Sequence, residues 1–360
     1  MVNTTKKQHY IWKKYLKKWV ISDVEEKLYV LRKQIHGKQA AIEYRKLDDI
    51  GFEKYFYDMS GFSKESINIL IQLLKHMQNK QSYQFLIDND MLKDAATQRD
   101  FIEKNVMCIN EDIDNKYNFL DKLVNKNFSF YEDSKSQTIL NRFQMLLHES
   151  LLGTDIMLSD DELKSMLNDF FKSLSDEDLK YEFNQFFWMQ YFRSPSVIKR
   201  LKASITKVKA QRVEFKNLDE KFFANMYAIY CAAQIALNLT QHFATNIYLL
   251  ENNTNVPFVT SDTPIINMTG IESLETSQKF LFYYPISPKI AIQLIVMLKT
   301  NFLAMQSKNC INSIGQNEVQ IVKDLNIIQA LECNNEIYSN DRNHLETIKN
   351  EIEKILHKGD

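Results

Sequence analysis

The spacing of hydrophobic and polar positions predicts strands near the N-terminus. Residues 27–33 and 40–45 are short runs rich in β-branched and aromatic residues, and Gly37 lies between them, which predicts a β-hairpin. Ahead of this hairpin, Tyr15 lies one helical turn before Trp19, a spacing that suits one face of a short helix. The N-terminal part of the chain should therefore contribute strands to a sheet.

Helical spacing dominates the middle of the chain. From residue 63 to about residue 250, apolar positions recur every three or four residues, and Ile67, Leu70 and Leu74 are a clear example. All five prolines lie at residue 195 or later, and the chain has only seven glycines, so few helix-breaking residues interrupt this region. The middle of the chain should form a layer of helices.

Strands and two further helices are expected in the last third of the chain. Residues 256–265 and 282–294 are rich in β-branched and aromatic residues, and proline bounds each run, as is typical of buried strands. The pattern beyond them predicts a helix near residues 318–332, a short extended piece at 336–339 and a charged helix at about 341–357.

Strands near both ends of the chain, with helices between them, predict an α+β fold. We expect one mixed sheet built from N- and C-terminal segments, with a large, mainly helical middle region. No low-complexity linker interrupts the 360 residues, so we interpret the chain as a single domain, 1–360. Its parts are an N-terminal basic segment with the β-hairpin (1–60), the helical region (61–250), and the strands and C-terminal helices that complete the sheet (251–360).

The helix expected at about residues 222–250 carries polar side chains on an otherwise apolar segment. Four of them recur at helical spacing with His242 alongside, and they are Gln234, Asn238, Gln241 and Thr245. Because buried amides and hydroxyls are costly unless paired, this stripe faces either a polar cavity or backbone groups that need partners. The sequence leaves both interpretations open.

Composition predicts a cytoplasmic protein. The four cysteines are widely scattered and form no CxxC pair, which favours a reducing compartment. The N-terminus has no apolar core of the kind a signal peptide needs. The most apolar long run, residues 222–250, contains too many polar side chains for a lipid-facing span, so we expect no membrane partner. The oligomeric state is left open.

The formal net charge of -1 conceals two basic blocks. Residues 1–46 carry twelve Lys or Arg against four Asp or Glu, and residues 193–216 carry eight against Glu214 alone. Should the two blocks meet in space, they would form a patch for a polyanion. The alternative is two separate solvated faces, since lysine-rich surfaces are ordinary.

Several short blocks, in this order, resemble those of the bacterial domain-of-unknown-function family 4238. The blocks are His9-Tyr10-Ile11 with Tyr15-Leu16, residues 55–58, residues 190–195, residues 258–264, residues 285–288 and Leu325-Asn326. The resemblance spans essentially the whole chain. Trp12 stands where the family usually has proline, and Thr263 where it more often has asparagine, but neither difference removes an ionisable group. The family name assigns no activity, so the resemblance supplies a fold-level identity and little chemistry.

Three residues in these blocks are candidate catalytic groups: His9, Arg193 and Asp262. A histidine can transfer a proton, a carboxylate can orient it or hold a metal, and an arginine can neutralise developing phosphate charge, so phosphodiester cleavage would use all three. Each also has a structural alternative. Asp262 can form an Asx turn, Arg193 can end a helix, and His9 can satisfy a buried backbone group.

Further residues are candidates for substrate binding, because they lie in the same blocks, the basic segments or the polar stripe: Tyr10, Lys14, Arg200, Gln234, Asn238, His242, Ser261 and Asn326. No metal-ligand set is predicted, and a divalent cation is the only cofactor considered. Walker A, dinucleotide-binding, His-Glu-x-x-His and Gly-x-Ser-x-Gly motifs are all missing from the sequence, so the corresponding enzyme classes are excluded.

Three functional hypotheses follow. The first is a nuclease, toxin-like or defence-associated, that acts on nucleic acid, with RNA favoured over DNA. The second is a non-catalytic module that binds nucleic acid or a protein through the same basic surface. The third is a hydrolase of a small phosphorylated ligand, which would need a closed pocket lined by the polar stripe.

Overall fold

A computed structural model describes residues 7–11, 13–21, 25–33, 40–54, 161, 184, 187–188, 190–221, 223–225, 228, 243–269, 279–298 and 310–357. The chain divides into two compact units. One comprises residues 1–6, 57–134 and 199–227, and the other comprises 7–56, 135–198 and 228–360. Most of the elements below belong to the second unit, and the single domain 1–360 remains a prediction.

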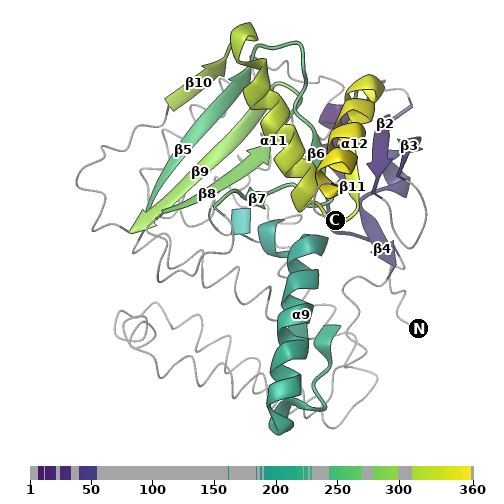
Figure 1. Cartoon of the computed structure of the whole chain (residues 1–360), viewed down its shortest axis with the longest axis vertical. Helices are drawn as coiled ribbons and strands as arrows, with labels where there is room; N and C mark the ends of the chain where they lie inside the picture. The colour runs from purple at the N-terminus through teal and green to yellow at the C-terminus, as the bar shows by residue number, and fades with distance from the viewer. Residues whose placement is uncertain are drawn as a thin grey trace, which may run out of the picture. The chain divides into compact units, whose positions relative to one another are not determined.

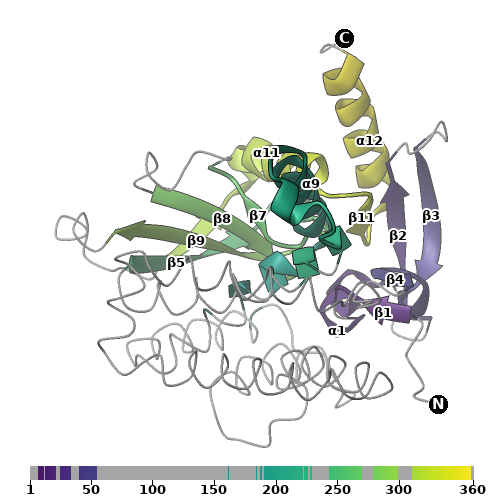
Figure 2. The ribbon, with the colours of Figure 1, turned by 90° about the horizontal axis from the view of Figure 1, so that it is seen from below.

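A four-stranded antiparallel sheet joins the two ends of the chain. Its order is β3-β2-β11-β6. The strands are β2 (Lys27–Arg32), β3 (Ala41–Lys46), β6 (Thr260–Ser261) and β11 (Glu336–Ser339). The N-terminal strand β2 lies beside the C-terminal strand β11 (Figures 1 and 2). N- and C-terminal segments therefore share a sheet, as predicted.

A second, five-stranded sheet has the order β10-β5-β9-β8-β7. Its strands are β5 (Phe243–Asn252), β7 (Ile266–Asn267), β8 (Lys279–Pro285), β9 (Ile290–Leu298) and β10 (Cys310–Ile314). Strand β10 runs parallel to β5, and the other described pairs are antiparallel, so this sheet is mixed. A separate ribbon pairs β1 (Lys7–His9) with β4 (Phe52–Lys54).

The described helices are α1 (Lys13–Leu16), α9 (Pro195–Gln211), α11 (Val319–Glu332) and α12 (Arg342–His357). Short 3-10 turns lie at η1 (Lys17–Trp19), η2 (Leu47–Asp49), η3 (Val213–Phe215) and η5 (Gln316–Glu318). Among the described residues, no helix combines the length and apolarity that crossing a bilayer would require.

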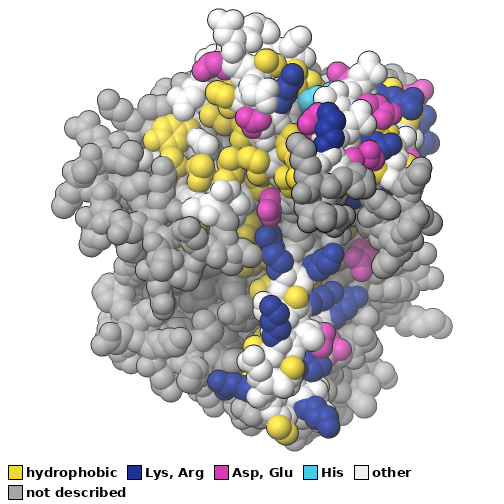
Figure 3. Space-filling model, viewed as in Figure 1, with side chains coloured by type: hydrophobic (Ala, Val, Ile, Leu, Met, Phe, Trp, Pro, Cys, Tyr) yellow, Lys and Arg dark blue, Asp and Glu magenta, His cyan; other side chains and the backbone are white. Residues whose placement is uncertain are grey.

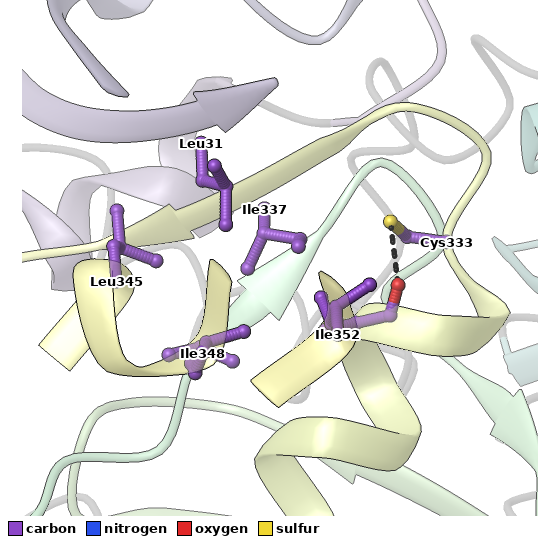
Figure 4. Close-up of a cluster of buried hydrophobic side chains, with 8 residues drawn as sticks. Leu31, Cys333, Ile337, Leu345, Ile348 and Ile352 are labelled. Carbon is purple, nitrogen blue, oxygen red and sulfur yellow. Dashed lines mark hydrogen bonds between the residues drawn. The ribbon is translucent and has the colours of Figure 1, made fainter. Parts of the chain in front are cut away.

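Helix α12 covers one face of the four-stranded sheet. Leu345, Ile348 and Ile352 recur every three or four residues, so they lie on one side of the helix and pack against Leu31 of β2 and Ile337 of β11 (Figure 4). All five side chains are buried. This contact joins the last helix of the chain to its first long strand.

Helix α11 covers part of the five-stranded sheet (Figure 1). Its Val322 and Leu325 pack against Leu250 of β5, Tyr283 of β8 and Ala291 of β9. Helices α11 and α12 also contact one another. The loop after α11 leads directly into β11, so α11 connects the two sheets.

The N-terminal segment is anchored to both sheets by two buried aromatic side chains. The indole N–H of Trp19 donates to the carbonyl oxygen of Phe258 at 3.0 Å. The hydroxyl of Tyr15 bonds to that of Thr260 at 2.7 Å, and it also donates to the carbonyl oxygen of Pro285. These bonds fix residues 15–19 against the chain on either side of β6.

The α+β class is confirmed, and so are the hairpin pairing of β2 with β3, strand β11, and helices α11 and α12. Three expectations were wrong. The expected single mixed sheet is two sheets and a ribbon. The helix expected through residue 250 is replaced from Phe243 onward by β5, so Thr245 lies in a strand. Residues 282–294 are not one strand, because β8 ends at Pro285 and the chain turns into β9. Most of the predicted helical region, 61–250, lies outside the described residues.

Candidate functional site

Asp262 lies at the end of β6, and its carboxylate binds three backbone N–H groups. One carboxylate oxygen accepts from Asn334 at 2.8 Å. The other accepts from Asn335 at 2.7 Å and from Glu336 at 3.1 Å. The residue is fully buried. Because α11 ends at Glu332, the N–H groups of the following turn have no helical carbonyl oxygen to bond to. The carboxylate of Asp262 accepts their hydrogen bonds instead.

Burial raises the pKa of Asp262 to about 6, against an ordinary value of 3.8. The three backbone hydrogen bonds act in the opposite direction, and the nearby charge of Glu336 adds to the increase. Asp262 therefore exchanges a proton close to neutral pH, while both of its oxygens are already engaged with the backbone.

Glu336 provides a second buried carboxylate beside Asp262. One of its oxygens accepts from Nε and Nη2 of Arg32, both at 3.0 Å. The other accepts from the hydroxyl of Tyr338 at 2.7 Å. Burial raises the pKa of Tyr10, and the charges of Asp262 and Glu336 raise it further, so this phenol lies within the field of both acids. We refer to Tyr10, Arg32, Asp262, Glu336 and Tyr338 as the acid cluster.

Arg193 precedes a segment that contacts the chain next to Asp262. Three residues later, Ser196 accepts a 2.8 Å hydrogen bond from the hydroxyl of Thr263, the residue after Asp262. The Arg193 side chain is buried, and its positive charge partly offsets the burial that raises the pKa of Tyr284 in β8. The residue that follows the block at 190–195 therefore contacts the block at 258–264.

His9 enters from the N-terminal ribbon. It pairs with Phe52 in β1–β4, and the backbone N–H of Tyr10 donates to the carbonyl oxygen of Gly51 at 3.0 Å. The side chain of His9 lies outside the described residues, whereas that of Tyr10 belongs to the acid cluster. Tyr10, the residue after His9, therefore lies near Asp262, and the catalytic roles of His9, Arg193 and Asp262 remain predictions.

Asn326 and Ser261 are fully buried and bond to the backbone. The side-chain oxygen of Asn326 accepts from the N–H of Val259 at 2.9 Å, and its amide nitrogen donates to the carbonyl oxygen of Pro257 at 2.8 Å. The hydroxyl of Ser261 donates to the carbonyl oxygen of Thr263 at 2.9 Å. Both side chains therefore hold the segment that leads to Asp262.

The remaining predicted residues fall into two groups. Arg200 lies on α9 and is half-buried. The side chain of Lys14 lies outside the described residues. So do Gln234 and Asn238 of the expected polar stripe, and His242 alongside it.

Helix α9 carries a basic surface. Within Pro195–Gln211, every charged side chain is Lys or Arg. Val197, Ile198 and Ile205 are buried on one side of the helix, while Lys199 and Lys207 are exposed on the other. Figure 3 shows Lys and Arg side chains along the exposed surface of this helix. We define the basic face as Lys199, Arg200 and Lys207, which lie on the side of α9 opposite these buried residues.

Another basic side chain of α9, Lys209, pairs with an acid. Lys209 forms a 3.1 Å ion pair with Glu220, and this contact is the main cause of a lowered pKa at Glu220. Because Lys209 also donates to the carbonyl oxygen of Leu218 at 2.8 Å, it ties α9 to the segment that follows. The exposed Lys199 and Lys207 leave positive charge at the surface.

Sequence reasoning missed Arg32, Glu336 and Tyr338, which complete the acid cluster. It also missed Gln329, whose amide donates to both Ser261 and Thr263 at 2.7 Å. The signal for Glu336 was its position as the first residue of a short buried strand, where a carboxylate needs a partner. Within the described part of the chain, no three His, Cys, Asp or Glu side chains are grouped to hold a metal ion.

A family model described as "Protein of unknown function (DUF4238)" matches residues 160–343. This range contains the blocks at 190–195, 258–264, 285–288 and Leu325-Asn326, whereas the two N-terminal blocks precede it. No curated protein and no solved structure matches the chain.

Proposed function

Because the chain belongs to the DUF4238 family, whose description names no activity, we propose a function from its own residues: it binds nucleic acid, with RNA favoured, through the basic face of α9. The observation that supports this proposal is a helix of 17 residues whose charged side chains are all basic. The charged side chains run from Lys199 to Lys209, so positive charge extends over about 15 Å of the helix, at a rise of about 1.5 Å per residue.

The distribution of charge favours a local contact. The whole chain has a formal net charge of -1, so it does not attract polyanions over its entire surface. On α9, by contrast, a buried apolar side anchors the helix and leaves the basic side outward. Lysine and arginine that neutralise phosphates release counterions, and this release drives sequence-independent binding.

The proposal is tested by fluorescence anisotropy with labelled single-stranded RNA, single-stranded DNA and duplex DNA over a range of salt concentrations. We expect binding that weakens as salt increases. In Lys199→Gln/Lys207→Gln, the slope of log K against log salt should decrease by about 0.7 per lysine for a single strand. The matched control is Lys349→Gln/Lys354→Gln on α12. Equal slopes in the two double variants would contradict the proposal.

A second candidate function is phosphodiester cleavage, and two observations support it: Tyr10 lies near Asp262, and Ser196, three residues after Arg193, bonds to Thr263, the residue after Asp262. In this proposal, His9 transfers the proton and Arg193 stabilises charge on the phosphate. The test is incubation of RNA and DNA with the protein, with and without Mg²⁺ or Mn²⁺, alongside Arg193→Gln and His9→Ala. Degradation that both variants abolish while circular dichroism stays unchanged supports cleavage. If the substrate stays intact in every condition, cleavage is contradicted and only the binding proposal remains.

A further inference from the structure

Asn326 of α11 and His344 of α12 form a side-chain contact between the two C-terminal helices. The amide nitrogen of Asn326 lies 2.8 Å from Nε2 of His344. Asn326 is fully buried, and His344 is half-buried in the first turn of α12. The same asparagine holds residues 257–259, which lead into β6. One side chain thus links α11, α12 and the strand segment.

The other hydrogen bonds of Asn326 decide which group donates in this contact. Its oxygen accepts from the N–H of Val259, and its nitrogen donates to the carbonyl oxygen of Pro257. Rotating the amide by half a turn would set oxygen against oxygen and nitrogen against nitrogen, so the orientation is fixed. The amide nitrogen must therefore donate to His344, and Nε2 must accept.

A ring nitrogen that accepts a hydrogen bond carries no proton. His344 is therefore neutral in this arrangement, with its proton on Nδ1. If Nε2 gained a proton, it would become a donor facing the amide donor of Asn326, and the hydrogen bond would be lost.

We propose that the Asn326–His344 contact is a proton-sensitive latch, which holds the first turn of α12 to α11 and to residues 257–259 when His344 is neutral and releases it when His344 is protonated. The latch is a conformational device independent of the proposed nucleic-acid binding.

The surroundings of His344 favour the latched form. Burial lowers the pKa of His344, and the positive charge of Lys323 lowers it further, while Asp341 acts in the opposite direction. Asp341 is itself engaged, because its carboxylate accepts from the N–H groups of Asn343 and His344 at the start of α12. The strand segment faces the contact with the backbone carbonyl of Pro257.

The sign of the pH dependence follows. A histidine whose folded pKa lies below the unfolded value of about 6.5 contributes stability that is present above that pH. The contribution is lost as the pH falls through the folded pKa. Acidification therefore opens the latch.

Nitrogen-15 NMR of the imidazole rings tests the latch in the wild-type chain. At pH 7.5, the His344 ring should be the Nδ1–H tautomer, assigned by the signal that disappears in His344→Gln. An Nε2–H tautomer would overturn the proposal. If His344→Gln does not fold, His344→Asn provides the assignment instead.

Hydrogen exchange at Val259, whose amide is held by Asn326, tests the release. After correction for intrinsic exchange, its protection should decrease by up to about tenfold between pH 7.5 and pH 5.5, as expected for losing one buried hydrogen bond. In His344→Gln, an amide oxygen accepts at every pH, so this decrease should vanish. An equal decrease in both proteins would assign it to another group and overturn the latch.

Discussion

Asp262 and Glu336 are joined by two hydrogen bonds that run in opposite directions. The backbone N–H of Asp262 donates to the carbonyl oxygen of Glu336 at 2.9 Å, and the N–H of Glu336 donates to the carboxylate of Asp262 at 3.1 Å. The first bond extends the β6–β11 pairing by one residue, and the second ends it. The carboxylate therefore determines where the C-terminal strand begins.

At pH 7, replacing Asp262 by asparagine should lower the free energy of unfolding by about 1–3 kcal/mol, because an amide N–H would face a buried backbone N–H. Urea unfolding followed by circular dichroism measures the change. The control is Asp324→Asn, since Asp324 is exposed on α11 and accepts only from Gln320 among its hydrogen bonds. It should change stability by less than about 0.5 kcal/mol. Equal effects would contradict a structural role for Asp262.

The pH dependence of stability should carry a contribution from Asp262. Its folded pKa of about 6 exceeds the ordinary 3.8, so the stability that it contributes is fully present below pH 3.8 and is lost as the pH rises through 6. The advantage of wild type over Asp262→Asn should therefore shrink from pH 4 to pH 7, by an amount on the order of 3 kcal/mol. Urea unfolding of both proteins at several pH values measures this stability difference. A stability difference that does not change with pH would show that burial does not raise the pKa of Asp262.

Removing Arg32 should destabilise the chain through the carboxylate that it leaves behind. Glu336 has a side chain only 9% exposed, whereas that of Arg32 is 37% exposed. We expect Arg32→Met to cost about 1–3 kcal/mol, because the buried charge loses its partner. Arg32→Met/Glu336→Gln should recover part of this loss, since no unpaired charge remains. A double variant less stable than Arg32→Met would contradict this explanation.

The core beneath α12 should be sensitive to truncation on one side of the helix only. Leu345→Ala removes a fully buried side chain and should cost about 2–5 kcal/mol. Ile355→Ala, on the same helix but 43% exposed, should cost less than about 1 kcal/mol. Thermal unfolding of the two variants makes the comparison, and similar losses would indicate that α12 does not pack as described.

The parts of the fold that sequence predicted are those with a clear period. In α12, buried Leu345, Ile348 and Ile352 alternate with charged residues, so the helical face is visible in the sequence. Strand β5 was missed because both of its faces are covered. The successive residues Leu249 and Leu250 face opposite sides of the sheet, and both are buried. No alternation of apolar and polar residues therefore marks the strand.

The candidate site was predictable in part. Tyr10 lies near Asp262, as the expectation of a sheet shared by N- and C-terminal segments allowed, while the roles of His9, Arg193 and Asp262 remain predictions. The partners of the acids were not predictable, because the pairing of Glu336 with Arg32 depends on the register of β11 against β2. A local pattern carries no information about such a register.

The insertion of β11 between β2 and β6 has a consequence for the order in which the protein is made. The ribosome releases the β2–β3 hairpin early, but the neighbour of β2 follows some 304 residues later in the sequence. The backbone hydrogen-bonding groups on one edge of β2 therefore remain unpaired during most of translation, and they can pair with an incorrect strand. Chaperone demand during synthesis should accordingly depend on how soon residues 336–339 emerge.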